Sequence, residues 1–535
     1  MAKKLALLLW MLLILIMIRE SSMMYTSRLV HRFSDELRGF SGKKLWPEFK
    51  SKEYYQRLSI GDFQRQKMKI GHQHQLVFPS QGSQAQSFGN ELGWLYYAWI
   101  DIGTPNVSFM VALDAGSDLL WVPCDCVQCA SLSATHYDGL DKNLNEYNPD
   151  SSNSSKLLTC SHRLCAQQEN CKSPTQSCPY NVQYFSENTS SSGQLVEDVL
   201  HLSSSSNSPS SIKASIIFGC GKKQSGVYLE EGIAPDGLMG LGPGDISVPS
   251  LLAKSGLIRN TFSLCFNENF SGRIYFGDQG LNTHQWTPFL PLDGKYSTYV
   301  VGVDSVCIGK GTCLKQTSFH AVVDSGFSFT YLPDDVYKKV TQEFDKEVEA
   351  ARVNYDGSPW DYCYKSSGDD LHNYPSLELM LPSNQSFVVQ YPMYTVNGYQ
   401  GIVGYCLAVG RADGDIAIIG QNFMTGYRMV FDRENMKLGW SHSDCQDLSN
   451  QNRKPSMPPA GDKPPNALPS NEQQSIPGAQ AVSPAIAGRT SPKASAASAM
   501  HPPFSSWILL SVLATSFVTF HLQWYFKSVF FLDLM

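Results

Sequence analysis

The sequence contains one short pattern twice, and this repeat constrains the fold more than any other feature. VALDAGSDLLW occupies residues 111–121, and AVVDSGFSFTYL occupies residues 321–332. In both copies an apolar run is followed by an aspartate, a small residue and a glycine, which places Asp114 and Asp324 at equivalent positions. A single aspartate after a strand is commonly a turn residue. Two such turns predict a fold made of two related halves.

The chemistry of such a pair follows from electrostatics. If the halves pack about a pseudo-twofold axis, the two turns meet at that axis. Two carboxylates a few ångströms apart cannot both ionise, so the pair shares one proton. One carboxylate then acts as a base that activates water, and the other as an acid that polarises a carbonyl. Gly116 and Gly326 allow a tight turn and the close approach of a substrate.

Length and composition fit a mainly β protein with more than one lobe. The chain has 535 residues, of which 42% are hydrophobic and 17% are charged, enough for a sizeable core. Its net charge of −6 gives no basic surface, so we expect no nucleic-acid partner. From residue 94 onward, short runs rich in Val, Ile, Tyr and Phe alternate with turn residues, which predicts many short strands. The clearest helical pattern lies within residues 333–351.

The N-terminus predicts export. Two lysines precede an unbroken apolar run over residues 5–18, which is typical of a signal peptide and short for a membrane span. The polar stretch that follows is either a pro-segment or a disordered arm, and a Pro/Ser/Ala-rich stretch after the last cysteine is a disordered stalk. The expected layout is a signal peptide (1–22), the pro-segment or arm (23–90), an N-terminal lobe (91–285), a C-terminal lobe (286–447), the stalk (448–503) and a hydrophobic tail (504–535).

The tail predicts attachment to a membrane. Small residues, a short spacer and an apolar run are the order of a GPI signal. The alternative is a single span over about residues 504–526, followed by a cytosolic stub. Both alternatives take the protein through the secretory pathway to the extracellular face of the cell membrane. The candidate GPI attachment residues are Ser495, Ala496, Ala497 and Ser498.

Fourteen cysteines, all between Cys124 and Cys445, predict a disulfide framework in an oxidising compartment. CDCVQC (124–129) and CSHRLC (160–165) have spacings found in zinc sites. No His–Cys cluster completes either set, so we expect no metal. Five sequons in the same region predict glycosylation wherever they are exposed: Asn106, Asn153, Asn188, Asn269 and Asn384.

Over about residues 90–445 the chain resembles the pepsin-like aspartic proteases, and more narrowly their plant aspartic proteinase-like and nepenthesin-like group. LDAGSDLLW and VVDSGFSF match the two active-site loops of that family. GLMGLGPGDIS (237–247) and AIIGQNFMTGYRMVFDRENMKLGW (417–440) match the strands that flank these loops. The resemblance implies a bilobal β fold with pseudo-twofold related lobes, a cleft between them and a flap hairpin. It also implies a monomer that needs no cofactor, acts on an extended peptide or protein, and uses Asp114 and Asp324 for catalysis.

The resemblance further implies roles for individual residues. YNVQYFSENTSSSG (180–193) corresponds to the flap, so Tyr184 is expected to be the flap tyrosine and Trp121 its hydrogen-bond partner. Ser117 keeps the hydroxyl that the family directs at the first carboxylate, and Ser325 keeps the one that bonds to the opposite loop. The family pattern also implies the disulfides Cys160–Cys178, Cys165–Cys171 and Cys363–Cys406, with Cys220–Cys445 joining the lobes.

Three departures from the family pattern bear on activity. Ala115 replaces a threonine whose hydroxyl bonds to the opposite loop, and losing such a bond costs on the order of 1 kcal/mol. Phe327 replaces a hydroxyl donor to the second carboxylate. Fewer donors to the ionised form raise the pKa of a carboxylate, so we expect a pH optimum less acidic than is usual for the family. The flap lacks the usual Gly/Ser-rich tip and carries the sequon at Asn188.

The sequence therefore predicts a secreted, surface-anchored aspartic endopeptidase, made as a zymogen if residues 23–90 are a pro-segment. The alternative is a catalytically weak or inactive protein of the same fold that acts as a binding or inhibitory protein at the cell surface. Such relatives typically lack a catalytic aspartate. The presence of both Asp114 and Asp324 favours the enzyme.

Overall fold

The computed structural model describes residues 24–34, 47–66, 95–130, 144–166, 170–184, 189–203, 211–226, 229, 236–267, 271–281, 283–292, 294–309, 312–355, 358–366, 374–398 and 401–445. The predicted signal peptide, the stalk with the candidate attachment residues, the hydrophobic tail, and the sequons at Asn188 and Asn269 lie outside these ranges. Within them, no helix has the length and apolar character needed to cross a membrane.

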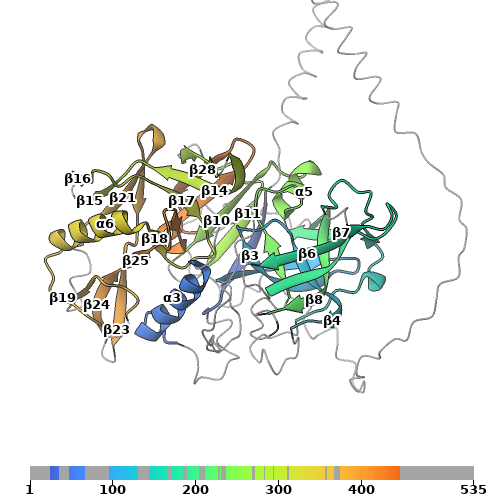
Figure 1. The fold of residues 1–535 in the computed structure, drawn as a ribbon, viewed down its shortest axis with the longest axis horizontal. Coiled ribbons are helices and arrows are strands. Elements are labelled where there is room, and N and C mark those ends of the chain that lie inside the picture. Colours follow the sequence, from blue (N-terminus) through green and yellow to red (C-terminus); the bar gives the residue numbers. More distant parts are fainter. Residues whose placement is uncertain are drawn as a thin grey trace, which may run out of the picture. The chain divides into compact units, whose positions relative to one another are not determined.

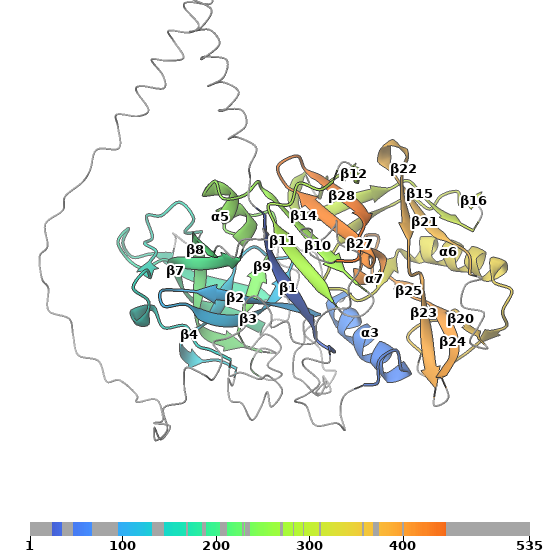
Figure 2. The same ribbon diagram turned by 180° about the vertical axis from the view of Figure 1, so that it is seen from behind.

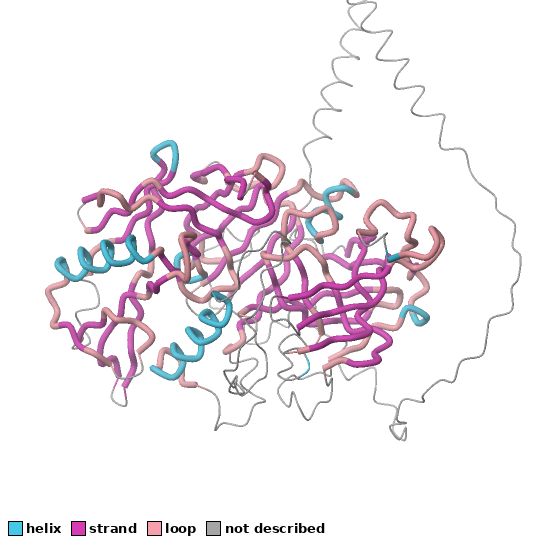
Figure 3. The backbone as a smooth tube through the Cα atoms, in the orientation of Figure 1, coloured by secondary structure: helices cyan, strands magenta, loops and turns pink. Residues whose placement is uncertain are grey.

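Strands dominate the described residues, which confirms the mainly β fold (Figures 1 and 3). One sheet contains most of the N-terminal lobe together with strands contributed by the chain's C-terminal part. Its strand order is β12 (Gln285–Pro288), β28 (Lys437–His442), β27 (Tyr427–Asp432), β10 (Thr261–Phe266), β11 (Gly272–Phe276), β1 (Tyr25–His31), β2 (Tyr96–Ile102), β3 (Val107–Asp114), β9 (Leu238–Gly240), β4 (Trp121–Gln128), β8 (Ser211–Ser225), β7 (Thr189–Ser203) and β5 (Lys156–Leu157), with β6 (Pro179–Tyr184) paired to β7.

The C-terminal lobe is built from three smaller sheets. The first has the order β13 (Leu290–Leu292), β14 (Lys295–Val303), β17 (Phe319–Val323), β26 (Ala417–Ile419), β18 (Thr330–Leu332) and β25 (Val409–Arg411). The second has the order β16 (Thr312–Cys313), β15 (Ser305–Ile308), β21 (Leu377–Leu381) and β22 (Gln385–Val389). The third has the order β19 (Arg352–Val353), β20 (Cys363–Lys365), β24 (Gly401–Leu407) and β23 (Met393–Gly398).

Helices are few among the described residues. The helix expected within residues 333–351 is confirmed as α6 (Asp334–Glu347), which buries an apolar face that includes Val336, Val340 and Phe344. Aspartates in its first turn suit the positive end of the helix dipole. The other helical segments are α3 (Lys52–Gln66), α5 (Val248–Lys254), α7 (Gln421–Met424), and the short 3₁₀ turns η1 (Pro149–Ser151) and η3 (Pro382–Asn384).

The segment that precedes the lobes is folded onto them where it is described. Strand β1 lies between β11 and β2 and pairs antiparallel with both, so that Leu29 faces Gly272 on one side and Ala98 on the other (Figure 2). Helix α3 lies beside the C-terminal lobe, near β23 and β25 (Figures 1 and 2). Residues 24–34 and 47–66 therefore form a strand and a helix that pack on the lobes.

The described residues contain seven disulfides, which use all fourteen cysteines. The predicted bond Cys363–Cys406 is confirmed, because β20 and β24 place the two residues directly opposite each other. The full set is Cys124–Cys220, Cys126–Cys129, Cys160–Cys171, Cys165–Cys178, Cys265–Cys445, Cys307–Cys313 and Cys363–Cys406.

The predicted pairings Cys160–Cys178 and Cys165–Cys171 are wrong. Cys160 is bonded to Cys171, and Cys165 to Cys178. The local register explains the exchange: the amide of Cys160 donates to the carbonyl of Gln176, so Cys160 does not lie opposite Cys178. All three sulfurs of the Cys160, Cys165 and Cys171 cluster lie in disulfides, so none is a thiolate available to a metal.

The predicted lobe-joining bond Cys220–Cys445 is also wrong. Cys220 on β8 is bonded to Cys124 on the neighbouring β4, and Cys445 to Cys265 on β10. Both cysteines thus have other partners, and β10 and β8 are not neighbours in the sheet order.

A buried ion pair links neighbouring strands of the large sheet. Arg428 on β27 donates to Asp278, which follows β11, through Nε at 2.5 Å and through Nη2. Their side chains are 4% and 1% exposed. Ser263 on β10 donates to the same carboxylate. One carboxylate therefore ties three strands of the large sheet together.

We expect that removing either partner of this pair strongly destabilises the protein. Asp278→Ala and Arg428→Ala should each lower the free energy of unfolding by about 3 kcal/mol, because the remaining charge is buried without compensation. Urea denaturation with the disulfides intact measures this. The control is Glu434→Ala in the half-exposed pair Arg259–Glu434, for which a loss below about 1 kcal/mol is expected. Equal losses at the buried and exposed pairs would contradict the prediction.

Candidate active site

The first Asp-x-Gly turn closes strand β3. Asp114 is the last residue of that strand and pairs in parallel register with Gly240 at the end of β9. Its side chain is 3% exposed. The backbone N–H of Gly116 donates to Oδ1 at 3.0 Å, and the hydroxyl of Ser117 donates to Oδ2 at 2.5 Å. These two donors orient the carboxylate and favour its ionised form.

The second turn has the same construction. Asp324 follows β17, which runs parallel to β26, and its backbone N–H donates to the carbonyl of Ile419 at 3.1 Å. The N–H of Gly326 donates to Oδ1 of Asp324 at 2.8 Å, as Gly116 does in the first turn. Phe327 occupies the position equivalent to Ser117 and is 2% exposed. Its ring lies 6.1 Å from that of Tyr331.

A glycine next to each turn allows a very close backbone approach. A Cβ added at Gly240 would lie 2.3 Å from the carbonyl carbon of Asp118, and one added at Gly420 would lie 2.1 Å from the carbonyl oxygen of Phe329. No side chain fits at either place. Both glycines end the apolar runs that the sequence matched to the flanking strands, so the structure confirms two related halves.

The strands after the two turns also correspond. Trp121 begins β4 and pairs with Leu238 of β9, while Tyr331 of β18 pairs with Ile418 of β26. Trp121 is fully buried. Ala115 and Ser325, the residues directly after the two aspartates, are 3% and 6% exposed. The bond from Ser325 to the opposite loop remains a prediction.

The predicted flap is a hairpin of β6 and β7. Its last described pair is Tyr184 with Thr189, and the tip between them, residues 185–188, lies outside the described residues, as does the side chain of Tyr184. The predicted bond between Tyr184 and Trp121 is therefore untested. Within the hairpin, the hydroxyl of Tyr180 lies 2.9 Å from that of Ser191. Of the five sequons, Asn106, Asn153 and Asn384 are exposed.

The strand that carries Asp114 is held by a second, fully buried carboxylate. Asp236 accepts the backbone N–H of Met110 on β3 at 2.7 Å and that of Asn145 at 2.9 Å. It lies two residues before β9, the strand that runs beside β3. Burial raises the pKa of Asp236 to about 8, although its two N–H donors act in the opposite direction.

Helix α3 contacts the second turn through an acidic residue that sequence reasoning missed. The carboxylate of Asp62 accepts the backbone N–H groups of Ser328 and Phe329, both at 2.8 Å, and the hydroxyl of Tyr331 at 3.0 Å. Asp62 is 2% exposed. The signal for α3 in the sequence is weak: Tyr54, Tyr55, Leu58 and Asp62 recur at helical spacing within a polar stretch.

Fold and turns together define a two-lobed β protein with one Asp-x-Gly turn in each lobe. Comparison with known proteins identifies the family. Residues 96–278 match the family described as xylanase inhibitor N-terminal, and residues 298–442 match xylanase inhibitor C-terminal. Aspartic proteinase-like protein 1 of Arabidopsis thaliana is 52% identical over 510 residues, which cover 92% of this chain and 95% of that protein. The chain belongs to the pepsin-like aspartic protease family.

Other relatives agree with this assignment. Aspartyl protease family protein 1 of Arabidopsis thaliana is 43% identical, with 78% of this chain and 80% of that protein covered. Nepenthesin-1 of Nepenthes gracilis is 25% identical, with 65% and 78% covered. Among solved structures, conglutin gamma, a basic 7S globulin from lupine seeds, superposes with a TM-score of 0.51 at 20% identity and covers 69% of this chain and 94% of its own. That likeness shows the fold alone.

The raised pKa of Asp236 predicts a protein that is more stable in acid. In the unfolded chain this carboxyl ionises near pH 3.8, and in the folded protein near pH 8. Its contribution to stability is therefore fully present below pH 3.8 and is lost as the pH rises through 8. We expect Asp236→Asn to flatten the dependence of the free energy of unfolding on pH between 4 and 8, by up to about 1.4 kcal/mol per pH unit.

Urea denaturation at a series of pH values measures this effect. The matched control is Asp413→Asn in an exposed turn, which should leave the pH dependence unchanged. If the stability of Asp236→Asn falls with pH as steeply as that of the wild type, the pH dependence does not come from Asp236.

Proposed function

We propose that this protein is an aspartic endopeptidase. The observation that carries the proposal is the pair of equivalent turns, each of which holds a buried aspartate by the N–H of the second residue after it. In the proposed mechanism Asp114 and Asp324 share one proton and titrate as a unit. One carboxylate removes a proton from water as it attacks the peptide carbonyl, and the other protonates the carbonyl oxygen. Tyr184 on the flap would close over the bound peptide.

The proposal includes synthesis as a zymogen. Residues 23–90 would contain the pro-segment, since α3 covers the backbone immediately after the second turn and Asp62 occupies its N–H groups. The backbone carbonyls of an extended substrate peptide need N–H donors of this kind, so α3 would have to leave before a peptide could use them. Seven disulfides and three exposed sequons support passage through the secretory pathway. Attachment to the outer face of the cell membrane through the C-terminal tail completes the proposal.

A second candidate function is that of a binding or inhibitory protein. The matched family bears the description of a xylanase inhibitor, and Ala115 and Phe327 remove two hydroxyls that the protease pattern contains. Both aspartates are nevertheless present, and Gly116, Ser117 and Gly326 donate to them. The enzyme remains the better supported function.

Peptide cleavage against pH tests the proposal. After incubation in acid to allow removal of the pro-segment, the full chain should cleave unstructured peptides in a pepstatin-sensitive manner. Asp114→Asn and Asp324→Asn should each lower the rate at least about a thousandfold, since each removes one member of the acid–base pair. The exposed variant Asp413→Asn is the control. If the folded, processed wild type cleaves no peptide at any pH, the binding protein becomes the better supported function.

The asymmetry between Ser117 and Phe327 predicts opposite shifts of the pH profile. Phe327→Ser supplies a donor to the second carboxylate and should move the acid limb of kcat/KM to lower pH. Ser117→Ala removes the 2.5 Å donor to Asp114 and should move it to higher pH. Each shift should be about one pH unit. Measured profiles in which both variants shift in the same direction would show that these hydroxyls do not control the ionisation of the pair.

A further inference from the structure

One side chain of α3 fills an aromatic enclosure on the C-terminal lobe. The ring of Tyr55 lies 4.9 Å from that of Trp360 and is stacked on that of Tyr394 at 5.4 Å. Its hydroxyl donates to the backbone carbonyl of Thr395 at 2.8 Å. Tyr55 is 2% exposed. The ring of Phe329 packs against both of these rings, 5.0 Å from Trp360 and 5.8 Å from Tyr394. We name Trp360, Tyr394, Phe329 and the Thr395 carbonyl the tyrosine cage.

The tyrosine cage adjoins the second Asp-x-Gly turn. Phe329 lies in the chain between Asp324 and β18, and its own N–H is one of the two that Asp62 occupies. Asp62 and Tyr55 are therefore two contacts of the same helix, one with the backbone beside the turn and one with the cage. A site for an extended peptide commonly combines donors for the peptide backbone with a pocket for one side chain. The N–H groups beside the turn and the tyrosine cage offer this combination.

Free space continues from the cage between α3 and the C-terminal lobe. A cavity of about 310 Å³ is lined by residues from both, including Tyr54, Leu58, Ser328, Met393 and Gln421. Its walls are mostly apolar with a few polar groups, as in sites that take one side chain or small ligand. A peptide bound in place of α3 would have room beside the cage without rearrangement of the lobe.

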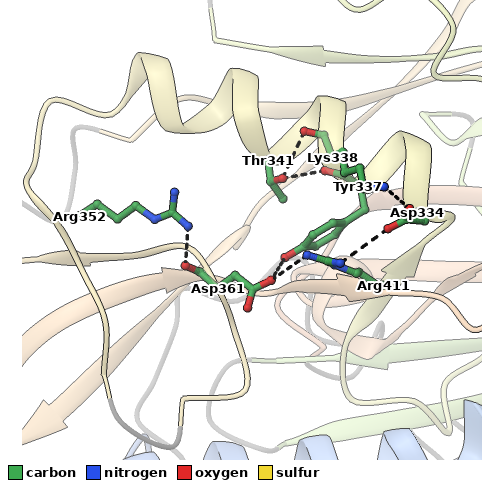
Figure 4. Close-up of polar contacts among 7 residues, drawn as sticks. All are labelled: Asp334, Tyr337, Lys338, Thr341, Arg352, Asp361 and Arg411. Carbon is green, nitrogen blue, oxygen red and sulfur yellow. Dashed lines mark hydrogen bonds and ion pairs between the residues drawn. The ribbon is translucent and has the colours of Figure 1, made fainter.

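The cage is held by contacts that do not involve α3. Figure 4 shows Asp361, the neighbour of Trp360, bound from several sides. Its carboxylate accepts from Tyr337 on α6 at 3.0 Å and from Arg411 at 3.4 Å, and its carbonyl accepts from Arg352 at 3.0 Å. Cys363 is tied to Cys406. Trp360 should therefore keep its place when α3 leaves.

We propose that the tyrosine cage is a substrate subsite that selects a tyrosine at one fixed position of the peptide, and that Tyr55 occupies it until α3 is removed. The proposal rests on the proposed function. Stacking and edge contacts favour an aromatic ring over an aliphatic side chain. The Thr395 carbonyl can only accept a hydrogen bond, so a phenol satisfies it and a phenyl ring does not. One such bond should favour tyrosine over phenylalanine by about fivefold.

The test begins with binding, in the full chain and without catalysis. In the Asp114→Asn background, Tyr55→Ala empties the cage, and N-acetyl-tyrosinamide should then bind saturably in calorimetry, about fivefold more tightly than N-acetyl-phenylalaninamide. The same chain with Tyr55 intact should not bind either probe, and adding Trp360→Ala should abolish binding. If Tyr55→Ala does not fold, Tyr55→Leu takes its place. Equal affinities for the two probes, or no binding, would overturn the proposal.

Cleavage provides the second arm. A set of peptides that differ only in the position of a single tyrosine or phenylalanine is given to acid-incubated wild type and Trp360→Ala. One position should show the fivefold preference for tyrosine, and Trp360→Ala should remove it. If peptides are cleaved but no position shows this preference, the proposed subsite is wrong and the proposed protease function stands. If the probes bind with the preference for tyrosine but no peptide is cleaved, the cage is a tyrosine-binding site and the proposed protease function is wrong.

Discussion

The structure depends on one arrangement used twice: a short strand with a glycine at or just after its end runs parallel to a strand with an aspartate at or just after its end. Beside β3 the short strand is β9, and beside β17 it is β26. Gly240 and Gly420 permit backbone approaches that no Cβ would tolerate. Backbone pairing with β9 or β26 therefore fixes the position of the strand that leads to each aspartate.

The described N-terminal segment is part of the architecture of the lobes. Strand β1 supplies backbone pairing to both β2 and β11, and α3 supplies an acceptor to the N–H groups after the second turn. Both contacts satisfy backbone groups that would otherwise need other partners. Both elements thus stabilise the lobes, and α3 also occupies the surface where we propose that a peptide binds.

Sequence reasoning predicted the elements whose signal is local. The Asp-x-Gly turns and α6 were found because strand, turn and helix patterns are set by adjacent residues. The disulfides Cys160–Cys171, Cys165–Cys178 and Cys265–Cys445 were not, because pairing depends on register and on sheet order. Helix α3 escaped because its buried face is formed by only a few residues in a polar stretch. Asp62 could not be assigned a partner, since the backbone that it binds lies more than 260 positions further along the chain.

The position of β1 has a consequence for any maturation of the chain. In the strand order β1 is the link between two groups, β12 to β11 on one side and β2 to β5 on the other. Taking it out would leave a gap of about two strand spacings, close to 10 Å, with two unpaired inner edges that are prone to pair with other chains. Excision of this segment would therefore amount to a strand exchange: another stretch of polypeptide has to enter the slot, or the two groups of strands have to close up against each other.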